Sequence, residues 1–377
     1  MPWSWQLSDW PDFHWQSHCI AKAEQRFVEG VSVTIGSLRH LPAHEREGLA
    51  VALLERDTLN TSAIEGELLD RDSVQSSLRK HLGLAQAPAA QWRGKPHEYG
   101  IAEMMVDLYH NPASPLTHER LFAWHRMTMH GRRDLASAGA YRQHGEPMQI
   151  VSGQIGDECV HYEAPPSAQI PAEMETFVQW FARTAPGTPG ALPAITRAAV
   201  AHLWFECIHP FEDGNGRIGR AVAEMALSQA TSTPCFTGMS TVLRCQRKTY
   251  YAQLKRHSVR LDIDEWLHWF AHCALQAQTE ADQFVRFLID KATLMHRLAG
   301  QLNPRQEKAL QRLFREGPQG FAGGLSAGNY AAITGAPTAT TTRDLADLVS
   351  KGALHRTGER KSTRYWLVVA ARSADAL

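Results

Sequence analysis

Hydrophobic residues recur every three or four positions along most of this chain, whereas runs that alternate apolar and polar residues are few and short. Spacing of three or four residues places apolar side chains on one face of an α-helix. The pattern therefore predicts a mainly α-helical fold with a few short strands. Two such helical faces enclose a polar segment, with Ile195, Ala199, Leu203 and Cys207 before it and Ile218, Val222, Met225 and Ala226 after it.

The first part of the chain, residues 1–84, is predicted to form an N-terminal helical module. Its opening segment is dense in aromatic residues, which we expect to pack against the helices that follow. Helical spacing then covers residues 21–41, 44–65 and 72–82. The Ala- and Pro-containing segment 85–90 predicts a flexible connection. The aromatic residues are Trp3, Trp5, Trp10, Phe13 and Trp15.

The last part of the chain, residues 300–369, predicts a separate small module. A helix starts at Asn303, two further helices cover residues 325–335 and 338–350, and a hairpin carries basic residues at its tip. This order resembles a winged helix with a helix-turn-helix, a fold that binds DNA in some proteins and docks other proteins or a second copy of the chain elsewhere. Both roles stay open. The candidate phosphate contacts are Arg343, Arg356, Arg360, Lys361 and Arg364.

Composition narrows the class of protein without naming a function. The chain has 377 residues, and its 39 Lys and Arg balance its 39 Asp and Glu, so the net charge is zero and does not favour nucleic acid as a partner. Six scattered cysteines form no Cys-x-x-Cys pair and indicate reduced thiols. A signal peptide and a membrane-length apolar run are absent from the sequence, which predicts a cytoplasmic protein that does not enter a membrane.

The polar segment between the two helical faces, residues 209–220, reads His-Pro-Phe-Glu-Asp-Gly-Asn-Gly-Arg-Ile-Gly-Arg. Pro210 cannot continue the preceding helix because it lacks an amide hydrogen and its ring clashes with the previous turn. The glycines 214 and 216 then lie at the N-terminus of the next helix, where free amide hydrogens and the helix dipole favour a bound anion. We expect Phe211 to point into the core and Glu212 to face solvent, while a share of Glu212 in metal binding stays open.

Four side chains of this segment suit a phosphorylated nucleotide. His209 can take a proton from a hydroxyl group near neutral pH. Asp213 supplies hard oxygen ligands of the kind that Mg²⁺ binds together with phosphate oxygens. Arg217 and Arg220 share one helix face and can neutralise a polyphosphate with planar, forked donors.

This segment resembles the Fic motif, His-Pro-Phe-x-Asp/Glu-Gly-Asn-Gly-Arg-x-x-Arg, and every fixed position is matched. The usual reaction of that family transfers AMP from ATP to a hydroxyl side chain of a target protein. The resemblance implies a Fic (Fido) core over residues 116–273, ATP and Mg²⁺ as ligands, His209 as the catalytic base and Asp213 as the metal ligand. The implied ATP-binding residues are Asp213, Gly214, Asn215, Gly216, Arg217, Ile218, Gly219 and Arg220, with Glu65 and with Gln246, where many relatives carry Asn.

Two flanking regions strengthen the resemblance. The stretch 116–129 is similar to the first helix of a Fic core, and the runs 149–151 and 159–162 predict a β-hairpin around two glycines. In the Fic family such a flap lies over the active site and pairs with the backbone of the target. The resemblance therefore implies flap residues, which are Gln149, Ile150 and Val151.

A further segment resembles the inhibitory helix of the family, Ser/Thr-x-x-x-Glu-Gly/Asn. Thr61 and Glu65 lie four residues apart on one helical face, and Gly66 can end the helix in a left-handed conformation. Alone, such a pair is typical of a solvated helix face. Beside the motif, the resemblance implies that Glu65 pairs with Arg220 and blocks the productive position of the ATP γ-phosphate.

These features predict an autoinhibited protein adenylyltransferase that transfers AMP to a Tyr, Thr or Ser hydroxyl of a target protein and releases pyrophosphate. Two other functions stay open. In one, Glu65 activates water and the same site removes AMP from a modified protein. In the other, the chain is a DNA-binding regulator with a silent Fic core. The target, self-modification, a homodimer and the favoured hydroxyl residue are not specified by the sequence.

Overall fold

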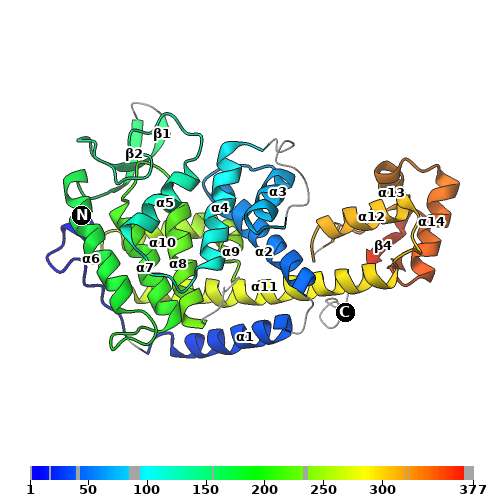
Figure 1. The fold of residues 1–377 in the computed structure, drawn as a ribbon, viewed down its shortest axis with the longest axis horizontal. Coiled ribbons are helices and arrows are strands. Elements are labelled where there is room, and N and C mark those ends of the chain that lie inside the picture. Colours follow the sequence, from blue (N-terminus) through cyan, green and yellow to red (C-terminus); the bar gives the residue numbers. More distant parts are fainter. Residues whose placement is uncertain are drawn as a thin grey trace. The chain divides into compact units, whose positions relative to one another are not determined.

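Fourteen α-helices and two antiparallel hairpins make up the part of the chain that the structure describes (Figure 1). The prediction of a mainly α-helical fold is therefore confirmed. The structure is a computed structural model. It describes residues 2–16, 18–39, 43–84, 94–154, 157–231, 237–318, 320–321 and 323–368.

The chain divides into two compact units, residues 1–279 and 280–377. The first unit holds ten complete helices, the first hairpin and the beginning of α11. Its elements are α1 (Ala21–Arg39), α2 (Ala43–Ile64), α3 (Arg71–His81), α4 (Pro96–His110), α5 (His118–Thr128), β1 (Gln149–Gln154), β2 (Asp157–Glu163), α6 (Ile170–Arg183), α7 (Ala194–Ile208), α8 (Asn215–Thr231), α9 (Met239–Cys245), α10 (Arg247–His257) and α11 (Asp264–Arg297).

Helix α7 lies at the centre of the first unit. All of its residues except Glu206 are buried, because α8 packs along it and α1, α6 and α10 contact it from other sides. Its apolar residues belong to one hydrophobic core that also contains Phe13, Phe27 and Val51. Residues of the predicted N-terminal module and of the predicted 116–273 core therefore share a single core, and the boundary between them stays a prediction.

The aromatic N-terminal segment packs against this core, as expected. Trp10 contacts Trp204 edge to face at 6.2 Å between ring centroids, and its indole N–H donates to Glu173 of α6. Trp5 donates to the backbone carbonyl of Glu163 at the end of β2. The segment therefore supports the hairpin as well as the helices.

Helix ends follow local capping. Gly66 has φ +86° and ends the turn after α2, as predicted. Pro193 is the N-cap residue of α7. Asp264 is the first residue of α11, and its carboxylate accepts a hydrogen bond from the backbone N–H of Gln16. Helix α11 continues to Arg297.

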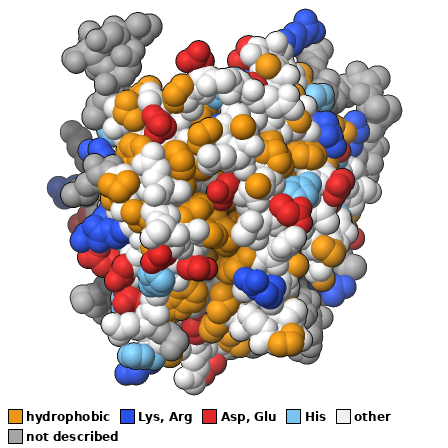
Figure 2. All heavy atoms as spheres, turned by 90° about the vertical axis from the view of Figure 1, so that its left-hand side faces the viewer, with side chains coloured by type: hydrophobic (Ala, Val, Ile, Leu, Met, Phe, Trp, Pro, Cys, Tyr) orange, Lys and Arg blue, Asp and Glu red, His pale blue; other side chains and the backbone are white. Residues whose placement is uncertain are grey.

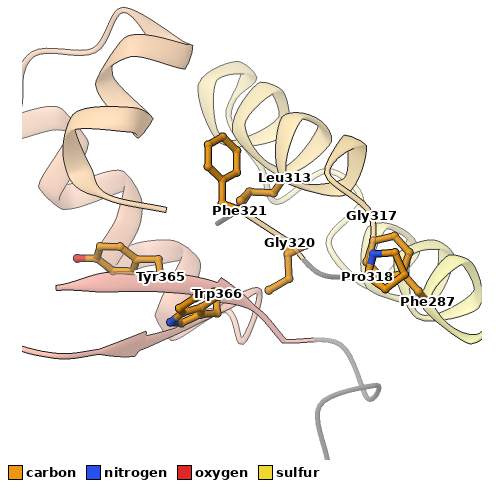
Figure 3. A pocket seen from close by; sticks show the side chains of 9 residues that line it. Phe287, Leu313, Gly317, Pro318, Gly320, Phe321, Tyr365 and Trp366 are labelled. Atoms are coloured by element: carbon orange, nitrogen blue, oxygen red, sulfur yellow. The ribbon is translucent and has the colours of Figure 1, made fainter. Parts of the chain in front are cut away.

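The second unit has its own core, built around Leu310, Leu345 and Tyr330. Its elements after α11 are α12 (Pro304–Arg315), α13 (Ala327–Thr334), α14 (Thr338–Ser350), β3 (Leu354–Thr357) and β4 (Arg364–Leu367). This order of elements matches the expected order, but its identity as a winged helix stays a prediction. A pocket of this unit (Figure 3) is lined by Phe287, Leu313, Gly317, Pro318, Gly320, Phe321, Tyr365, Trp366 and Leu367.

Two further findings concern the described residues only. None of their helices combines the length and the apolar character that crossing a membrane requires. Cys19, Cys207, Cys245 and Cys273 are free thiols, whereas the side chain of Cys159 and the whole of Cys235 lie outside the described part. The connection predicted at residues 85–90 also lies outside it.

Candidate active site

The motif forms the joint between α7 and α8. His209 follows the last residue of α7 and has φ 50° and ψ 60°, a left-handed conformation that is uncommon for a residue with a side chain. Its backbone N–H donates to the carbonyl of Phe205 and so closes the helix. Because a strained backbone of this kind persists only where its surroundings hold it, this position is a candidate for function.

A side-chain clamp fixes the loop between the two helices. The Asn215 amide accepts a hydrogen bond from the backbone N–H of Phe211 and donates one to its carbonyl, at 2.9 and 2.8 Å. Phe211 is fully buried, as predicted, and stacks on His125 with ring centroids 4.2 Å apart. His125 accepts from the N–H of Gly139 and contacts the carbonyl of Asp213 at 3.2 Å. Glu212 is partly exposed, and its carboxylate accepts a hydrogen bond from the N–H of Ala136.

His209 is poised as a neutral imidazole. Burial, together with the positive charge of Arg142, lowers its pKa to about 4. Its Nδ1 atom is buried and has no hydrogen-bond partner among the described residues. At neutral pH the ring is therefore uncharged and able to accept a proton.

Asp213 lies between two arginines. Its Oδ2 atom is 2.7 Å from Arg132, and its Oδ1 atom is 3.4 Å from Arg217 and accepts from the N–H of Gly214. Burial alone would raise the pKa of Asp213, but Arg217 and Arg132 outweigh it and hold that pKa low. Its side chain stays 40% exposed, so an ionised carboxylate faces solvent at the N-terminus of α8.

Both arginines of the motif are buried and paired with carboxylates from the segment after α2. Arg220 lies 2.8 Å from Glu65 and donates to the hydroxyl and the carbonyl of Thr61. Arg217 lies 2.7 Å from Glu67. Each arginine also carries one buried nitrogen without a hydrogen-bond partner among the described residues, Nη1 of Arg220 and Nε of Arg217. Since orphaned buried donors are costly, they indicate room for a further acceptor.

The Glu65 carboxylate lies against the first turn of α8. A Cβ atom added to Gly216 would come within 2.3 Å of its Oε1 atom, so this residue must be glycine for Glu65 to sit there. The first amides of a helix have no partner within the helix and attract anions. Glu65 therefore occupies the position where the sequence predicts a phosphate. Tyr251 donates to the other oxygen of Glu65 at 3.3 Å.

A further acidic side chain, Glu206 of α7, lies near Arg220 and Glu65, and one of its carboxylate oxygens is buried. The Oε1 atom of Glu206 has no hydrogen-bond partner among the described residues and approaches Gly219 so closely that a Cβ there would be 2.6 Å away. Burial raises the pKa of Glu206 to about 8, with Arg220 opposing the rise and Glu65 adding to it. Glu206 is therefore protonated at neutral pH.

The predicted hairpin is present beside the motif. β1 and β2 pair from Gln149–Glu163 to Gln154–Asp157, and the register shifts between Ile150 and Val151. Along the described residues β1 pairs only with β2, so its other edge is open. On the molecular face that carries α6 and the hairpin, hydrophobic side chains alternate with side chains of both charges (Figure 2). Exposed apolar side chains of the hairpin are Ile150, Val151 and Val160.

The structure brings most predicted site residues together, whereas Ile218 and Gln246 make other contacts. His209, Asp213, the glycines of α8, Arg217, Arg220, Thr61 and Glu65 share one region through the contacts above. Ile218 is fully buried in the core. Gln246 donates to Gln276 of α11 at 3.1 Å, so its side-chain amide already has a partner. Sequence reasoning missed Glu67, Arg132 and Glu206, because none of them has a fixed place in the motif.

Two family models match the chain. Residues 3–84 match a domain of unknown function, DUF4172. Residues 115–227 match the Fic/DOC family and include the joint between α7 and α8. The two matches cover the predicted inhibitory segment and the predicted catalytic motif respectively.

Curated relatives are adenylyltransferases by name. Over 230 residues, 59% of the chain, it is 25% identical to protein adenylyltransferase fic-1 of Caenorhabditis briggsae and covers 41% of that protein. Over 134 residues, 34% of the chain, it is 31% identical to protein adenylyltransferase Fic of Drosophila virilis and covers 26% of it. The chain thus spans less than half the length of these relatives.

A solved structure shares the fold. A Fic family protein from Desulfovibrio desulfuricans G20 superposes with a TM-score of 0.52 at 20% identity, over 95% of this chain and 98% of that one. At this identity the likeness concerns the fold alone.

Proposed function

Because the chain belongs to the Fic/DOC family through residues 115–227, we propose that it is a protein adenylyltransferase held in an autoinhibited state. The observation that supports this best is the position of Glu65, which lies against the first turn of α8 and pairs with Arg220. An internal carboxylate there stands where an anionic substrate would bind. The adenylyltransferase names of the curated relatives agree with ATP as that substrate.

In the proposed reaction, His209 takes the proton of a target hydroxyl whose oxygen attacks the α-phosphorus of ATP. A bond from that oxygen to the α-phosphorus forms, and the bond to the bridging oxygen breaks, so pyrophosphate leaves with the electron pair. The neutral imidazole of His209 suits this step, because its pKa lies well below neutrality. Little covalent work falls to the protein, so positioning and charge carry the catalysis.

Arg217, Arg220 and the first turn of α8 would hold the phosphates. The unpartnered nitrogens of both arginines supply hydrogen-bond donors, and Gly216 has no side chain to fill the space that Glu65 now occupies. Asp213 fits a magnesium ion bound together with phosphate oxygens, because Mg²⁺ takes one or two carboxylates and keeps water or substrate as its other ligands. The described residues hold no cluster of three such side chains, so the substrate would complete the coordination. When bound, Mg²⁺ neutralises phosphate charge.

In this proposal, autoinhibition results from competition between carboxylates and phosphates for Arg217 and Arg220. Thr61 and Glu65 occupy three donor positions of Arg220, and Glu67 adds a second ion pair at Arg217. A nucleotide whose phosphates need these guanidinium groups must displace the carboxylates first. We propose that the segment 61–67 keeps the site closed until it moves.

The hairpin would present the target. The open edge of β1 offers backbone groups for strand addition, and the exposed side chains of Ile150 and Val151 offer apolar contacts. Backbone pairing would bring a hydroxyl of an extended target segment toward His209 without a strict sequence requirement.

The test is transfer of label from α-labelled ATP with Mg²⁺ to protein by the wild type, Glu65→Gly and His209→Ala. We expect weak labelling of the wild type, strong labelling in Glu65→Gly and none in His209→Ala. Leu68→Gly, at an exposed side chain three residues after Glu65, controls for added flexibility. His110→Ala, at an exposed histidine that ends α4, controls for the loss of an imidazole.

Labelling that is equal in the wild type and Glu65→Gly would contradict the inhibitory role. Absence of label from every variant, with ATP binding shown by calorimetry, would contradict transfer. Release of AMP from a modified protein, or binding of DNA by the C-terminal module, would then favour the other two functions.

A further inference from the structure

Four successive backbone carbonyls, from Cys207 to Pro210, lie at the C-terminal end of α7, around the proposed catalytic base His209. Helix ends leave such carbonyls without partners inside the helix. Here each one accepts a hydrogen bond from outside the helix. Tyr162 of β2 donates its hydroxyl to Cys207, while Arg142 donates to Ile208, His209 and Pro210.

Arg142 supplies most of these bonds. Its Nε atom donates to the His209 carbonyl at 2.9 Å, its Nη2 atom approaches the Ile208 carbonyl at 3.5 Å, and its backbone N–H donates to Pro210 at 3.0 Å. A planar fork is suited to neighbouring acceptors in this way. A cation at a helix C-terminus also interacts favourably with the helix dipole.

The Arg142 guanidinium also contacts the segment that follows β2 of the hairpin. Its Nη2 atom donates to the Pro165 carbonyl at 2.5 Å, and its Nη1 atom donates to the Ser167 hydroxyl at 2.9 Å. Both acceptors directly follow β2, and Arg142 itself precedes β1. One side chain therefore links the backbone of His209 to the segment that follows β2 of the hairpin.

Arg142 is costly to bury. Only 1% of it is exposed, and the described residues offer it no carboxylate within ion-pair distance. A buried charge without a counter-ion lowers stability, and here the hydrogen bonds to backbone carbonyls and to Ser167 offset part of that cost. His209, whose carbonyl it holds, has the left-handed backbone conformation described above.

We propose that Arg142, assisted by Tyr162, is a positioning residue that holds the strained backbone of His209 and locks it to the β1–β2 hairpin. This inference rests on the proposed transferase function. A target segment paired with β1 and the base that deprotonates its hydroxyl would then share one rigid frame. Small displacements matter here, since a misplacement of about 1 Å can cost roughly a hundredfold in rate.

The experiment measures self-labelling with α-labelled ATP and Mg²⁺ in the Glu65→Gly chain, with and without Arg142→Gln, Arg142→Lys or Tyr162→Phe. We expect Arg142→Gln to lower kcat by roughly a hundredfold and Tyr162→Phe to lower it less. The dissociation constant of ATP, measured by calorimetry, should stay within about twofold in all variants. Arg142→Lys keeps the charge but not the fork, so it should also lower kcat.

The pH–rate profile separates positioning from stability. The groups that face His209 are Arg142 from the loop before β1, Asp213 from the motif loop, Glu206 from α7 and, in the wild type only, Glu65 from the turn after α2. Removing the Arg142 charge should raise the His209 pKa and move the acid limb of the profile to higher pH, whereas Arg142→Lys should leave that limb in place. Arg197→Gln is the matched control.

Arg197 is as buried as Arg142 and lies in the first turn of α7, at the opposite end of that helix from His209, where it donates to the Phe181 carbonyl. Its variant should lower thermal stability without moving the acid limb. Suppose that the Glu65→Gly chain labels itself, and that adding Arg142→Gln changes neither kcat nor the acid limb of the pH–rate profile. This result would overturn the positioning role of Arg142 and leave the proposed transferase function intact. Should Arg142→Gln fail to fold, unchanged kcat in Tyr162→Phe and Arg142→Lys would overturn it.

Discussion

At the scale of single residues, two carboxylates rather than one pair with the arginines of the motif. Glu65 and Glu67 are only two positions apart and could not share a face of a regular helix. The left-handed turn at Gly66 redirects the chain, so Glu67 meets Arg217 while Glu65 meets Arg220. The family motif names Glu65 alone, which is why sequence reasoning found one pair and missed the other.

Glu67→Gln should therefore loosen the closed state even with Glu65 in place. The ion pair is partly exposed on the glutamate side, so its loss is expected to be worth about 1 kcal/mol, or roughly a fivefold gain in labelling. The measurement is the rate of labelling with α-labelled ATP and Mg²⁺. Glu47→Gln, at an exposed glutamate of α2, should change nothing. A rate equal to that of the wild type would show that Arg217 is not restrained by Glu67.

Glu206→Gln should change how stability depends on pH. An unperturbed glutamate titrates near 4.5, whereas Glu206 keeps its proton until about pH 8 when folded. Between these values the folded state binds one proton more than the unfolded state, so the free energy of unfolding falls as pH rises, by about 1.4 kcal/mol per unit.

The glutamine variant cannot ionise and should lack this part of the slope. Chemical unfolding of the wild type, Glu206→Gln and the exposed control Glu29→Gln at pH 5.5, 7 and 8.5 measures it. Parallel curves for the wild type and Glu206→Gln would mean that the Glu206 carboxyl is ionised in the folded protein.

At the scale of elements, local capping signals mark where helices start. Thr117 caps α5 by accepting from Arg120, and Asn303 caps α12 by accepting from two backbone amides. Helix α11 extends to Arg297 because apolar residues such as Phe287 continue the helical spacing into a second core. The motif joint was predictable from Pro210 and the glycines. The clamp by Asn215 was not, because the sequence does not tell whether an amide binds ligand or backbone.

Asn215→Ala tests this joint as an element. Its side chain satisfies the buried N–H and carbonyl of Phe211, and leaving both unpaired is expected to lower the free energy of unfolding by about 2 kcal/mol. Labelling in the Glu65→Gly chain should fall with it. Asn111→Ala, which removes an exposed amide at the end of α4, should cost less than about 0.5 kcal/mol. If Asn215→Ala kept the stability of the wild type but lost labelling, Asn215 would instead contact the bound substrate.

At the scale of the whole molecule, the described residues form two hydrophobic cores that share no residue. The core of the first unit ends at Ala277, and the core of the second begins at Phe287. All motif residues, Glu65, Glu67 and the first hairpin belong to the first unit. The sequence predicted a separate C-terminal module, but not that a single helix, α11, would serve both cores.

A chain shortened to residues 1–279 should therefore fold and keep its chemistry. Its core remains complete, so we expect a cooperative thermal transition within a few degrees of the first transition of the full chain. The shortened Glu65→Gly chain should label itself at the rate of the full-length Glu65→Gly chain, and His209→Ala should abolish the label in both. A shortened chain that folds but labels far more slowly would assign the second unit a part in catalysis, through the hydroxyl that accepts AMP or through contacts that open the site.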